Sequence, residues 1–172
     1  MKKSDINPMP EFFDRYINLA EDEELISSLE RNLKVLETIN IDSLKSIGDK
    51  VYEADKWTIK DIFQHLIDNE RIQSYRALRI ARNDKTILPG YDENLLAMNT
   101  NTKNQSLEIL LEEFKLIRKS SILLFKSFTD EMLLRKGICY KVDISALALG
   151  FQLSGHQIHH LNIIKERYLP LN

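Results

Sequence analysis

The sequence contains little cysteine, glycine and proline. With Cys139 as the only cysteine in 172 residues, neither an intramolecular disulfide nor a thiolate zinc cluster is expected, and this suits a reducing cytosol. Five glycines and four prolines are too few for a fibrous or low-complexity chain and favour long helices. A chain of this length is expected to form a single domain, residues 1–172.

Charge of one sign and long apolar runs are also scarce. The 24 basic and 26 acidic residues give a net charge of −2, so no strong global field attracts nucleic acid or anionic lipid. No run of about 18 apolar residues is present to span a bilayer. The charged N-terminus also lacks the apolar core of a secretory signal. We therefore expect a cytoplasmic protein that binds neither nucleic acid nor membrane.

Four long segments of the chain have helical periodicity, because apolar residues recur in them every three or four positions. These segments cover approximately residues 22–39, 58–82, 106–128 and 145–168. A shorter helix is predicted over residues 11–19, and residues 139–143 are predicted to be extended. Gly150 and Gly155, inside the last helix, indicate close packing or access to a site. The predicted fold class is all-α, a four-helix bundle with long connecting loops.

The connection between the second and third predicted helices is unusually long. Residues 83–105 contain Pro89-Gly90 and an Asn/Thr cluster at positions 99–102, which indicates a loop. Loops of this length are uncommon in compact domains and often form lids or walls of sites. Long connections also favour a bundle with crossovers over a simple up-down-up-down arrangement.

The four histidines are the strongest candidates for metal binding or catalysis. On a helical wheel His160 lies about 40° from His156, inside the apolar stripe of the last helix, whereas His159 lies at the edge of that stripe. A His-x-x-x-His pair on one helical face can direct two imidazoles at one metal ion. The alternative is that each is a hydrogen-bonded core residue, although burying two unpaired imidazoles in one stripe is costly.

His65 adds a third candidate ligand, on the second predicted helix and beside its apolar arc. Three neutral imidazoles with an open fourth position are the ligand set of a catalytic zinc site. Zinc or nickel suits this set best, and iron or manganese are alternatives. The zincin motif is absent because Gln157, not Glu, follows His156. The di-iron motif is absent because no Glu stands three residues before a histidine.

Glu70 is unusual because it lies in the middle of the apolar arc of the second predicted helix. A buried carboxylate needs a partner, and the candidates are Arg71, Arg76, Arg167 or the second ring nitrogen of a histidine. Glu70 is therefore either one half of a buried ion pair between helices or a general base. The sequence favours the ion pair slightly.

Two further side chains are candidates for proton transfer near a metal. His159 lies beside the His-x-x-x-His pair, and Asp92 lies in the long loop, where acids are most often simply solvated. A basic run along the second helix is interpreted as a solvated face, because we expect it to lack the interleaved exposed aromatic residues of a nucleic-acid surface. It consists of Arg71, Arg76, Arg79 and Arg82.

Three segments carry a resemblance to a known family: WTIKDIFQHLIDNER at 57–71, LPGYDE at 88–93, and GHQIHHL at 155–161 followed by ERY at 166–168. In this combination the sequence resembles the DinB/YfiT-like metal-dependent bundles, over almost the whole chain from Pro10 onward. The specific part is the spacing from tryptophan to histidine together with the His-x-x-x-His pair.

The resemblance implies a four-helix bundle in which His65, His156 and His160 bind a divalent metal, commonly within a homodimer. His159 is then a neighbour of the ligands. Members of this family resemble one another more in fold than in reaction. We expect a metal-dependent enzyme that activates water to hydrolyse a small-molecule substrate, with Glu70, Asp92 or His159 moving protons. The alternatives are an S-transferase that uses a low-molecular-weight thiol, and a non-catalytic bundle that binds metal or a partner.

Overall fold

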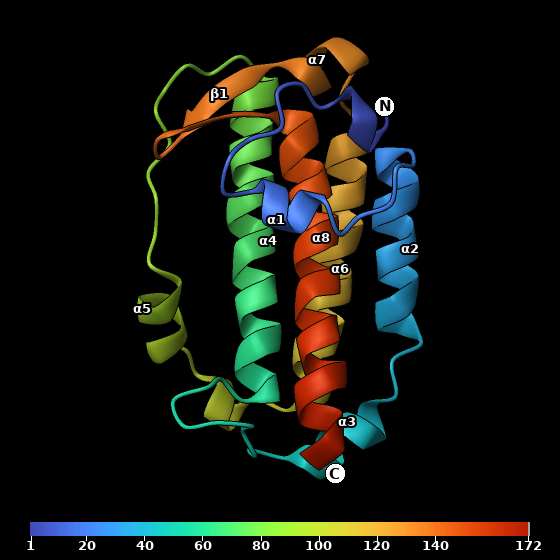
Figure 1. Cartoon of the computed structure of the whole chain (residues 1–172), viewed down its shortest axis with the longest axis vertical. Coiled ribbons are helices and arrows are strands. Elements are labelled where there is room, and N and C mark those ends of the chain that lie inside the picture. The colour runs from blue at the N-terminus through green and yellow to red at the C-terminus, as the bar shows by residue number, and fades with distance from the viewer. Residues whose placement is uncertain (172) are drawn as a thin grey trace.

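The computed structural model describes residues 1–171 and contains a bundle of four long helices (Figure 1). These helices are α2 (Leu25–Glu37), α4 (Ile59–Ala81), α6 (Leu107–Lys126) and α8 (Ala146–Ile163). The last one continues through a π-helical turn, Ile164–Tyr168, and a 3-10 turn, Leu169–Leu171. The all-α class and the four helices predicted from periodicity are therefore confirmed.

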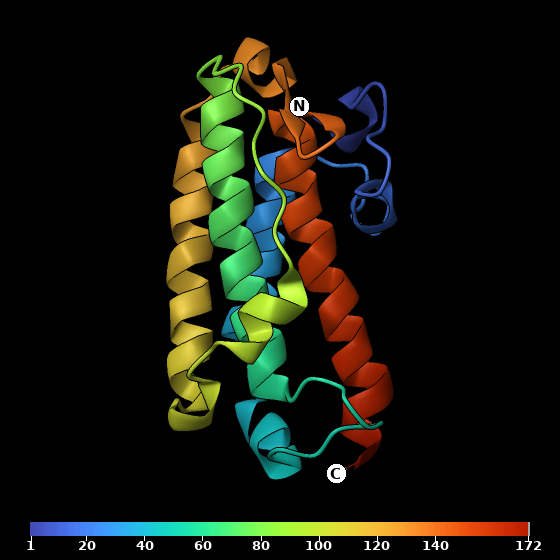
Figure 2. The same cartoon turned by 90° about the vertical axis from the view of Figure 1, so that its left-hand side faces the viewer.

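The connectivity of the bundle is not up-down-up-down. α2 and α8 run in one direction, and α4 and α6 run in the other (Figures 1 and 2). α4 packs against α6 and α8, and α2 packs against the same two helices, so that α2 and α4 are diagonal neighbours. The long connection between α4 and α6 joins two parallel helices by returning along the side of the bundle, as Figure 2 shows. The predicted crossover is confirmed.

The long connections contain short helices that the sequence pattern does not predict. α3 (Ile41–Ile47) follows α2, and α5 (Glu93–Met98) and a 3-10 turn (Thr102–Asn104) interrupt the loop predicted over residues 83–105. Both α3 and α5 start at a side-chain cap. The Asn40 side chain accepts a hydrogen bond from the backbone of Ser43 at the start of α3, which is how a short polar segment gains one helical turn.

The N-terminal helix is shorter than predicted. α1 (Asp14–Ile17) occupies the middle of the range expected to be helical, residues 11–19, and a 3-10 turn (Lys3–Asp5) precedes it. Phe12 has a φ of 69°, in the left-handed region, which keeps residues before it out of the helix. α1 lies across α8 (Figure 1).

A small hairpin covers one end of the bundle. After α7 (Asp130–Leu134) come β1 (Lys136–Cys139) and β2 (Val142–Ser145), which pair antiparallel with Cys139 opposite Val142. The turn consists of Tyr140 and Lys141, and Tyr140 has a φ of 59°. The predicted extended stretch at 139–143 is therefore the centre of a longer hairpin.

The start of α4 is fixed by a capping box. The Thr58 side chain accepts a hydrogen bond from the Asp61 backbone at 3.2 Å, and Asp61 accepts one from the Thr58 backbone at 3.1 Å. Such reciprocal caps satisfy backbone N–H groups that have no partner within the helix. The Thr102 hydroxyl donates to the second oxygen of Asp61 at 2.6 Å, so the long connection is attached to the end of α4 that carries His65.

Both glycines of α8 permit close packing, as the sequence indicates. A Cβ on Gly155 would lie 1.8 Å from the carbonyl oxygen of Tyr16, so only glycine lets α1 approach α8 this closely. A Cβ on Gly150 would lie 2.7 Å from a methyl group of Leu25 and 3.0 Å from the Phe125 ring. Gly155 therefore positions α1 beside the histidines of α8.

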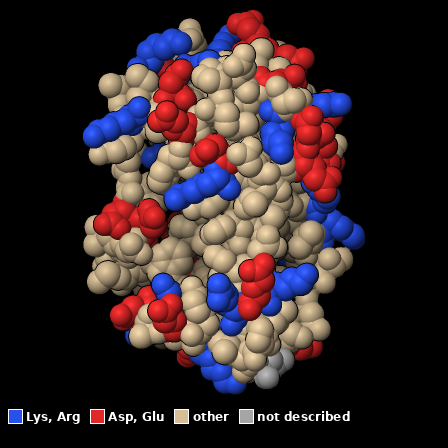
Figure 3. Space-filling model, in the orientation of Figure 1, with Lys and Arg blue, Asp and Glu red and all other residues tan. Residues whose placement is uncertain are grey.

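Charged side chains of both signs are interspersed on the face shown in Figure 3. This agrees with the near balance of 24 basic and 26 acidic residues. Among residues 1–171, none of the helices has both the length and the apolar character needed to cross a membrane.

Candidate metal centre

Three of the four histidines meet between α4 and α8. His65 lies in the second turn of α4, and His156 and His160 lie one turn apart on α8. The Nε2 atom of His156 is 3.0 Å from Nε2 of His65 and 3.1 Å from Nε2 of His160. One potential ligand atom from each residue lies within 4.8 Å of the other two. The structure therefore brings together the residues that the sequence selects as metal ligands.

The donor set fits a divalent metal ion better than it fits a hydrogen-bonded core. Two nitrogens bound about 2.0–2.1 Å from one ion at angles of about 90–110° lie about 2.8–3.4 Å apart, which covers both separations of 3.0 and 3.1 Å. Without an ion, Nε2 of His156 can donate to one of its two neighbours at most. An ion would use the converging lone pairs that hydrogen bonds leave unsatisfied.

Burial keeps the three imidazoles neutral, which is the state that binds metal. It lowers the pKa of His65 from 6.5 to about 4 and that of His160 to about 2. The pKa of His156 also falls well below its usual value, chiefly because of burial and secondly because of the neighbouring His160. Protons therefore compete weakly for these nitrogens at neutral pH.

Aromatic rings hold the imidazoles on two sides. Trp57 directly precedes the capping box of α4, and its ring centroid lies 4.6 Å from that of His65. The Tyr16 ring meets the His156 ring edge to face at 4.9 Å. Because Gly155 admits α1 against α8, the position of Tyr16 depends on that glycine. The spacing of Trp57 to His65 is part of the family resemblance, but neither Trp57 nor Tyr16 is predicted from the sequence as a site residue.

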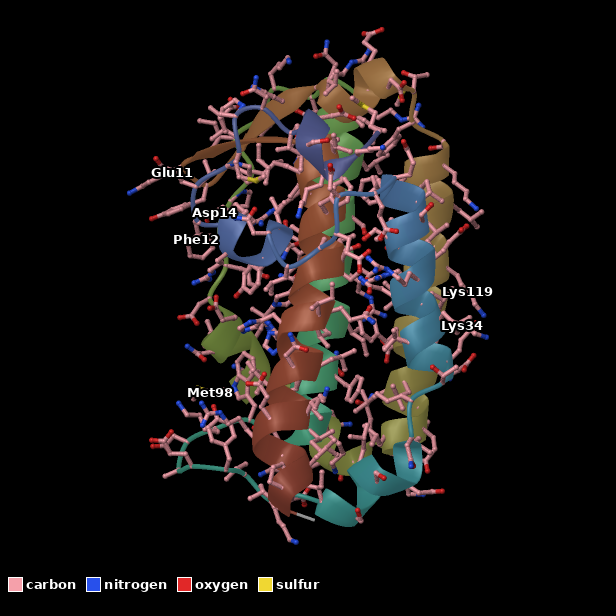
Figure 4. All side chains as sticks on the ribbon, turned by 45° about the vertical axis from the view of Figure 1, so that its right-hand side comes forward. Glu11, Phe12, Asp14, Lys34, Met98 and Lys119 are labelled. Carbon is pink, nitrogen blue, oxygen red and sulfur yellow. The ribbon has the colours of Figure 1, made fainter. Side chains whose placement is uncertain are left out.

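A cavity of about 510 Å³ extends from the histidines between α4, α8, the N-terminal segment, the α4–α6 connection and the hairpin. This volume is in the usual range for small-molecule sites. Its walls include His65, His156 and His160, so a ligand in the cavity can reach all three. Figure 4 shows Phe12, another lining residue, on the side of the molecule opposite Lys34 and Lys119. The cavity therefore opens away from the face formed by α2 and α6.

A row of buried polar side chains lines the cavity beyond the histidines. Asn69 donates to the Tyr91 hydroxyl at 2.7 Å and accepts from the Gln152 amide at 3.2 Å. Further along α4, Arg76 donates to Gln73 at 3.2 Å. Arg76 is 5% exposed, so the interpretation of the arginine run as a solvated face is wrong for this residue. It lies on the same face of α4 as His65 and Asn69, which is a signal available in the sequence.

Glu70 forms a buried ion pair, and its partner is Arg118 of α6. Its two oxygens accept hydrogen bonds from Nε and Nη2 of Arg118, each at 2.7 Å. The partners expected from the sequence, Arg71, Arg76 and Arg167, are wrong. Glu70 does not line the cavity, so its suggested role as a general base stays a prediction that this placement does not favour.

The two other candidates for proton transfer lie outside the cavity wall. Asp92 is exposed and caps α5, where it accepts hydrogen bonds from the backbones of Asn94 and Leu95 at 2.9 and 3.0 Å. His159 is partly exposed, and its ring lies 5.0 Å from that of His160. Their catalytic roles stay predictions. The acid that does line the cavity is Glu93, next to Asp92 in the sequence.

Comparison with known proteins identifies the family of the chain and solved structures with a similar fold. A sequence model of the DinB superfamily matches residues 24–164, a range that includes all three clustered histidines. A structure of YfiT from Bacillus subtilis, described as a probable metal-dependent hydrolase with an unusual four-helix bundle topology, has a TM-score of 0.58 and 19% sequence identity. The match covers 90% of this chain and 87% of that one, and identity this low establishes a shared fold alone. No curated protein sequence matches the chain.

Proposed function

The chain belongs to the DinB superfamily, and we propose that it is a metal-dependent hydrolase of a small-molecule substrate. His65, His156 and His160 would hold the ion, with zinc or nickel as the metals that suit three imidazoles best. A divalent ion in such a site supplies a Lewis acid that polarises a carbonyl group and lowers the pKa of water. The description of YfiT as a probable metal-dependent hydrolase supports this proposal.

The observation that carries the proposal is that the three Nε2 atoms converge in the wall of a cavity. His65, His156 and His160 all line this cavity, which has a volume of about 510 Å³. A structural metal site is normally closed by a fourth protein ligand. Within residues 1–171, the clustered potential ligands are these three histidines, with no acid or cysteine among them. A substrate group can therefore occupy the remaining position.

Tyr91 is suited to orient the substrate and to hold a proton beside it. Its hydroxyl oxygen accepts a hydrogen bond from Asn69 at 2.7 Å, so its own O–H is free to donate into the cavity. Burial raises the pKa of Tyr91, which keeps this proton in place at neutral pH. Glu93, two positions further along the chain, lines the same cavity, and its carboxylate is able to accept a proton from an attacking water.

Thiol transfer is the second candidate reaction, and the state of Cys139 indicates where its thiol would come from. Cys139 is buried, at 2% exposure, and burial raises the pKa of its thiol. A buried, protonated thiol is a poor nucleophile. An S-transferase built on this site would therefore take its thiol from a low-molecular-weight cosubstrate. The cavity has room for one beside an electrophile.

Activity of the metal-loaded protein distinguishes these reactions. The protein is loaded with zinc or nickel and assayed against a panel of aryl esters and amides, with and without a small thiol and an electrophile. The proposal expects ester or amide cleavage that needs no thiol, stops on chelation, and is absent in His156→Ala/His160→Ala. The Tyr91→Phe variant is expected to turn over more slowly with the same metal content. Turnover only with thiol would replace hydrolysis by S-transfer, and equal cleavage by wild type and the double variant would overturn the site.

A further inference from the structure

Arg76 is a buried cation without an acidic partner, at the end of the cavity away from the histidines. We propose that its guanidinium binds a carboxylate of the ligand, whose reacting group lies at the three histidines. The position of the reacting end rests on the proposed function, whereas the anion site rests on Arg76 alone. The ligand is thus an elongated small molecule with a negative charge at one end.

The hydrogen bonds of Arg76 give partners to two of its N–H groups but do not neutralise its positive charge. Nη1 donates to the side-chain oxygen of Gln73 at 3.2 Å, and Nη2 donates to the carbonyl oxygen of Pro89 at 2.5 Å. Both acceptors are neutral, and no carboxylate of residues 1–171 lies within ion-pair distance of Arg76. Burying an unpaired charge is costly, so buried arginines are normally paired.

Arg118 shows how the same bundle treats a buried arginine that has only a structural role. It is fully buried, and Glu70 neutralises it through two hydrogen bonds of 2.7 Å each. Arg76 has comparable burial but faces the cavity. The difference between the two arginines is that the partner of Arg76 must enter from outside the chain.

The other charges around the cavity favour an anion as well. Arg15, Arg76 and Lys141 line it, against the single acid Glu93. This excess of positive charge occurs in a chain whose net charge is −2. Side chains of one sign that line a cleft raise the local concentration of ligands of the opposite sign. Arg76 is the buried cation among them, and its two hydrogen-bond acceptors are neutral. A single buried guanidinium matches a carboxylate better than a phosphate monoester, which carries about two charges at pH 7.

The spacing along α4 gives the ligand its elongated form. His65, Asn69, Gln73 and Arg76 follow at steps of four, four and three residues, which places them on one face of the helix. The rise from the first to the last is about 16 Å. Through its bond to Gln73, the Arg76 side chain is directed back toward the histidine end.

Gln152 offers a contact between the two ends of the ligand. Its amide nitrogen donates to Asn69, whereas its Oε1 is buried without a hydrogen-bond partner in the part of the chain that the structure describes. Gln152 is 1% exposed and lines the cavity. A buried acceptor without a partner is costly, so a hydroxyl or amine of the ligand is expected to donate to it.

Two matched hydroxamates test the anion site. Suberic acid monohydroxamate and octanohydroxamic acid share one chelating group and one chain length, but the first ends in a carboxylate and the second in a methyl group. Their Kd values are measured by calorimetry on zinc-loaded wild type and on the Arg76→Gln variant. The preference for the carboxylate probe is expected to fall at least about tenfold in Arg76→Gln, the scale of one charge-assisted hydrogen bond. The Kd of the methyl probe is expected to stay unchanged.

Control variants separate the charge of Arg76 from general damage to the fold. Arg82→Gln removes the same charge from an exposed position at the C-terminal cap of α4, six residues further along, and is expected to behave as wild type. Arg76→Lys keeps the charge and is expected to retain part of the preference. The methyl probe reports the integrity of the cavity in every variant.

Repeating the titrations after chelation separates this inference from the proposed function. Removing zinc is expected to weaken both probes, while the difference in preference between wild type and Arg76→Gln remains. If chelation has no effect, the proposed role of the metal is wrong. The Arg76 site is then still tested by the ratio of the two Kd values in wild type and in Arg76→Gln. If wild type and Arg76→Gln show the same preference in both metal states, the carboxylate site is wrong.

Discussion

Replacing Glu70 by glutamine is expected to destabilise the fold by about 3–5 kcal/mol, the cost of breaking a buried ion pair from one side. Glu70 is 2% exposed and Arg118 is fully buried. Both carboxylate oxygens accept from the guanidinium at 2.7 Å. Glutamine removes the negative charge and turns an N–H toward the same donors. Because Nη1 of Arg118 already lacks a partner among residues 1–171, the buried charge would be left uncompensated.

Urea-induced unfolding of metal-free wild type and Glu70→Gln measures this loss. The exposed pair of Arg71 and Glu113, with a 2.6 Å contact, supplies the matched control. Glu113→Gln is expected to cost at most about 1 kcal/mol, as exposed pairs do. Metal content is expected to stay the same in both variants. A Glu70→Gln protein that is as stable as wild type but inactive with metal bound would refute the structural role and restore Glu70 as a general base.

Three further predictions concern packing, pH and metal removal. A Cβ at residue 155 would lie 1.8 Å from the Tyr16 carbonyl oxygen, so Gly155→Ala is expected to lower the free energy of unfolding by about 1–3 kcal/mol and to weaken zinc binding. Gly150→Ala meets only side-chain tips at 2.7 and 3.0 Å and is expected to cost less in the same denaturation assay; equal costs would contradict the packing of α1 on α8. The pKa values of His65 and His160 are about 4 and about 2 in the folded protein, against 6.5 normally, so the unfolded chain binds more protons below pH 6.5. The stability of the metal-free protein is therefore expected to fall as the pH decreases from about 6.5 toward 4, with a smaller slope in His156→Ala/His160→Ala; a flat profile between pH 7 and 5 would contradict the burial of these rings. Chelation is expected to lower the Tm of zinc-loaded wild type, since an ion at 100 times its Kd contributes about 2.7 kcal/mol; a Tm that does not respond to chelation would contradict preferential binding of the ion to the folded protein.

The four long helices are predictable because each buries one face, and the residues of that face are set by short-range spacing in the sequence. Apolar residues at three- and four-residue steps face the core, and start signals such as the capping box of Thr58 and Asp61 are complete within four residues. The short helices α3 and α5 are less predictable because each depends on one cap and a few contacts. A single Asn40 or Asp92 cap occurs in many turns that do not continue as a helix.

The histidine cluster is predictable for the same reason, because the spacing of His156 and His160 on one helical face is a local property. The meeting of His65 with this pair needs the packing of α4 on α8, which the family resemblance implies and the structure provides. The contact between Tyr16 and His156 is not predictable from either helix alone. It depends on Gly155, whose missing side chain gives no indication of which segment will fill the space.

The burial of two arginines, Arg76 and Arg118, is also not predicted from the sequence, although each has a local signal. Arg118 follows Phe114 by four positions and Leu111 by seven, which places it inside the apolar stripe of α6. Arg76 lies on the face of α4 that carries His65. In both cases the charge suggests an exposed position, while the helical spacing indicates a buried one. The spacing is the better guide because a long helix offers no local freedom to rotate one residue out of its stripe.

The stoichiometry of bound metal tests the central claim most directly. Purified wild type and His156→Ala/His160→Ala are dialysed against zinc or nickel, and the metal content per chain is measured by elemental analysis. Gln64→Ala, a partly buried residue of α4 outside the cavity, serves as the control. We expect one ion per chain in wild type and in Gln64→Ala, and none in the double variant. Equal metal content in all three proteins would contradict the assignment of His65, His156 and His160 as the metal site.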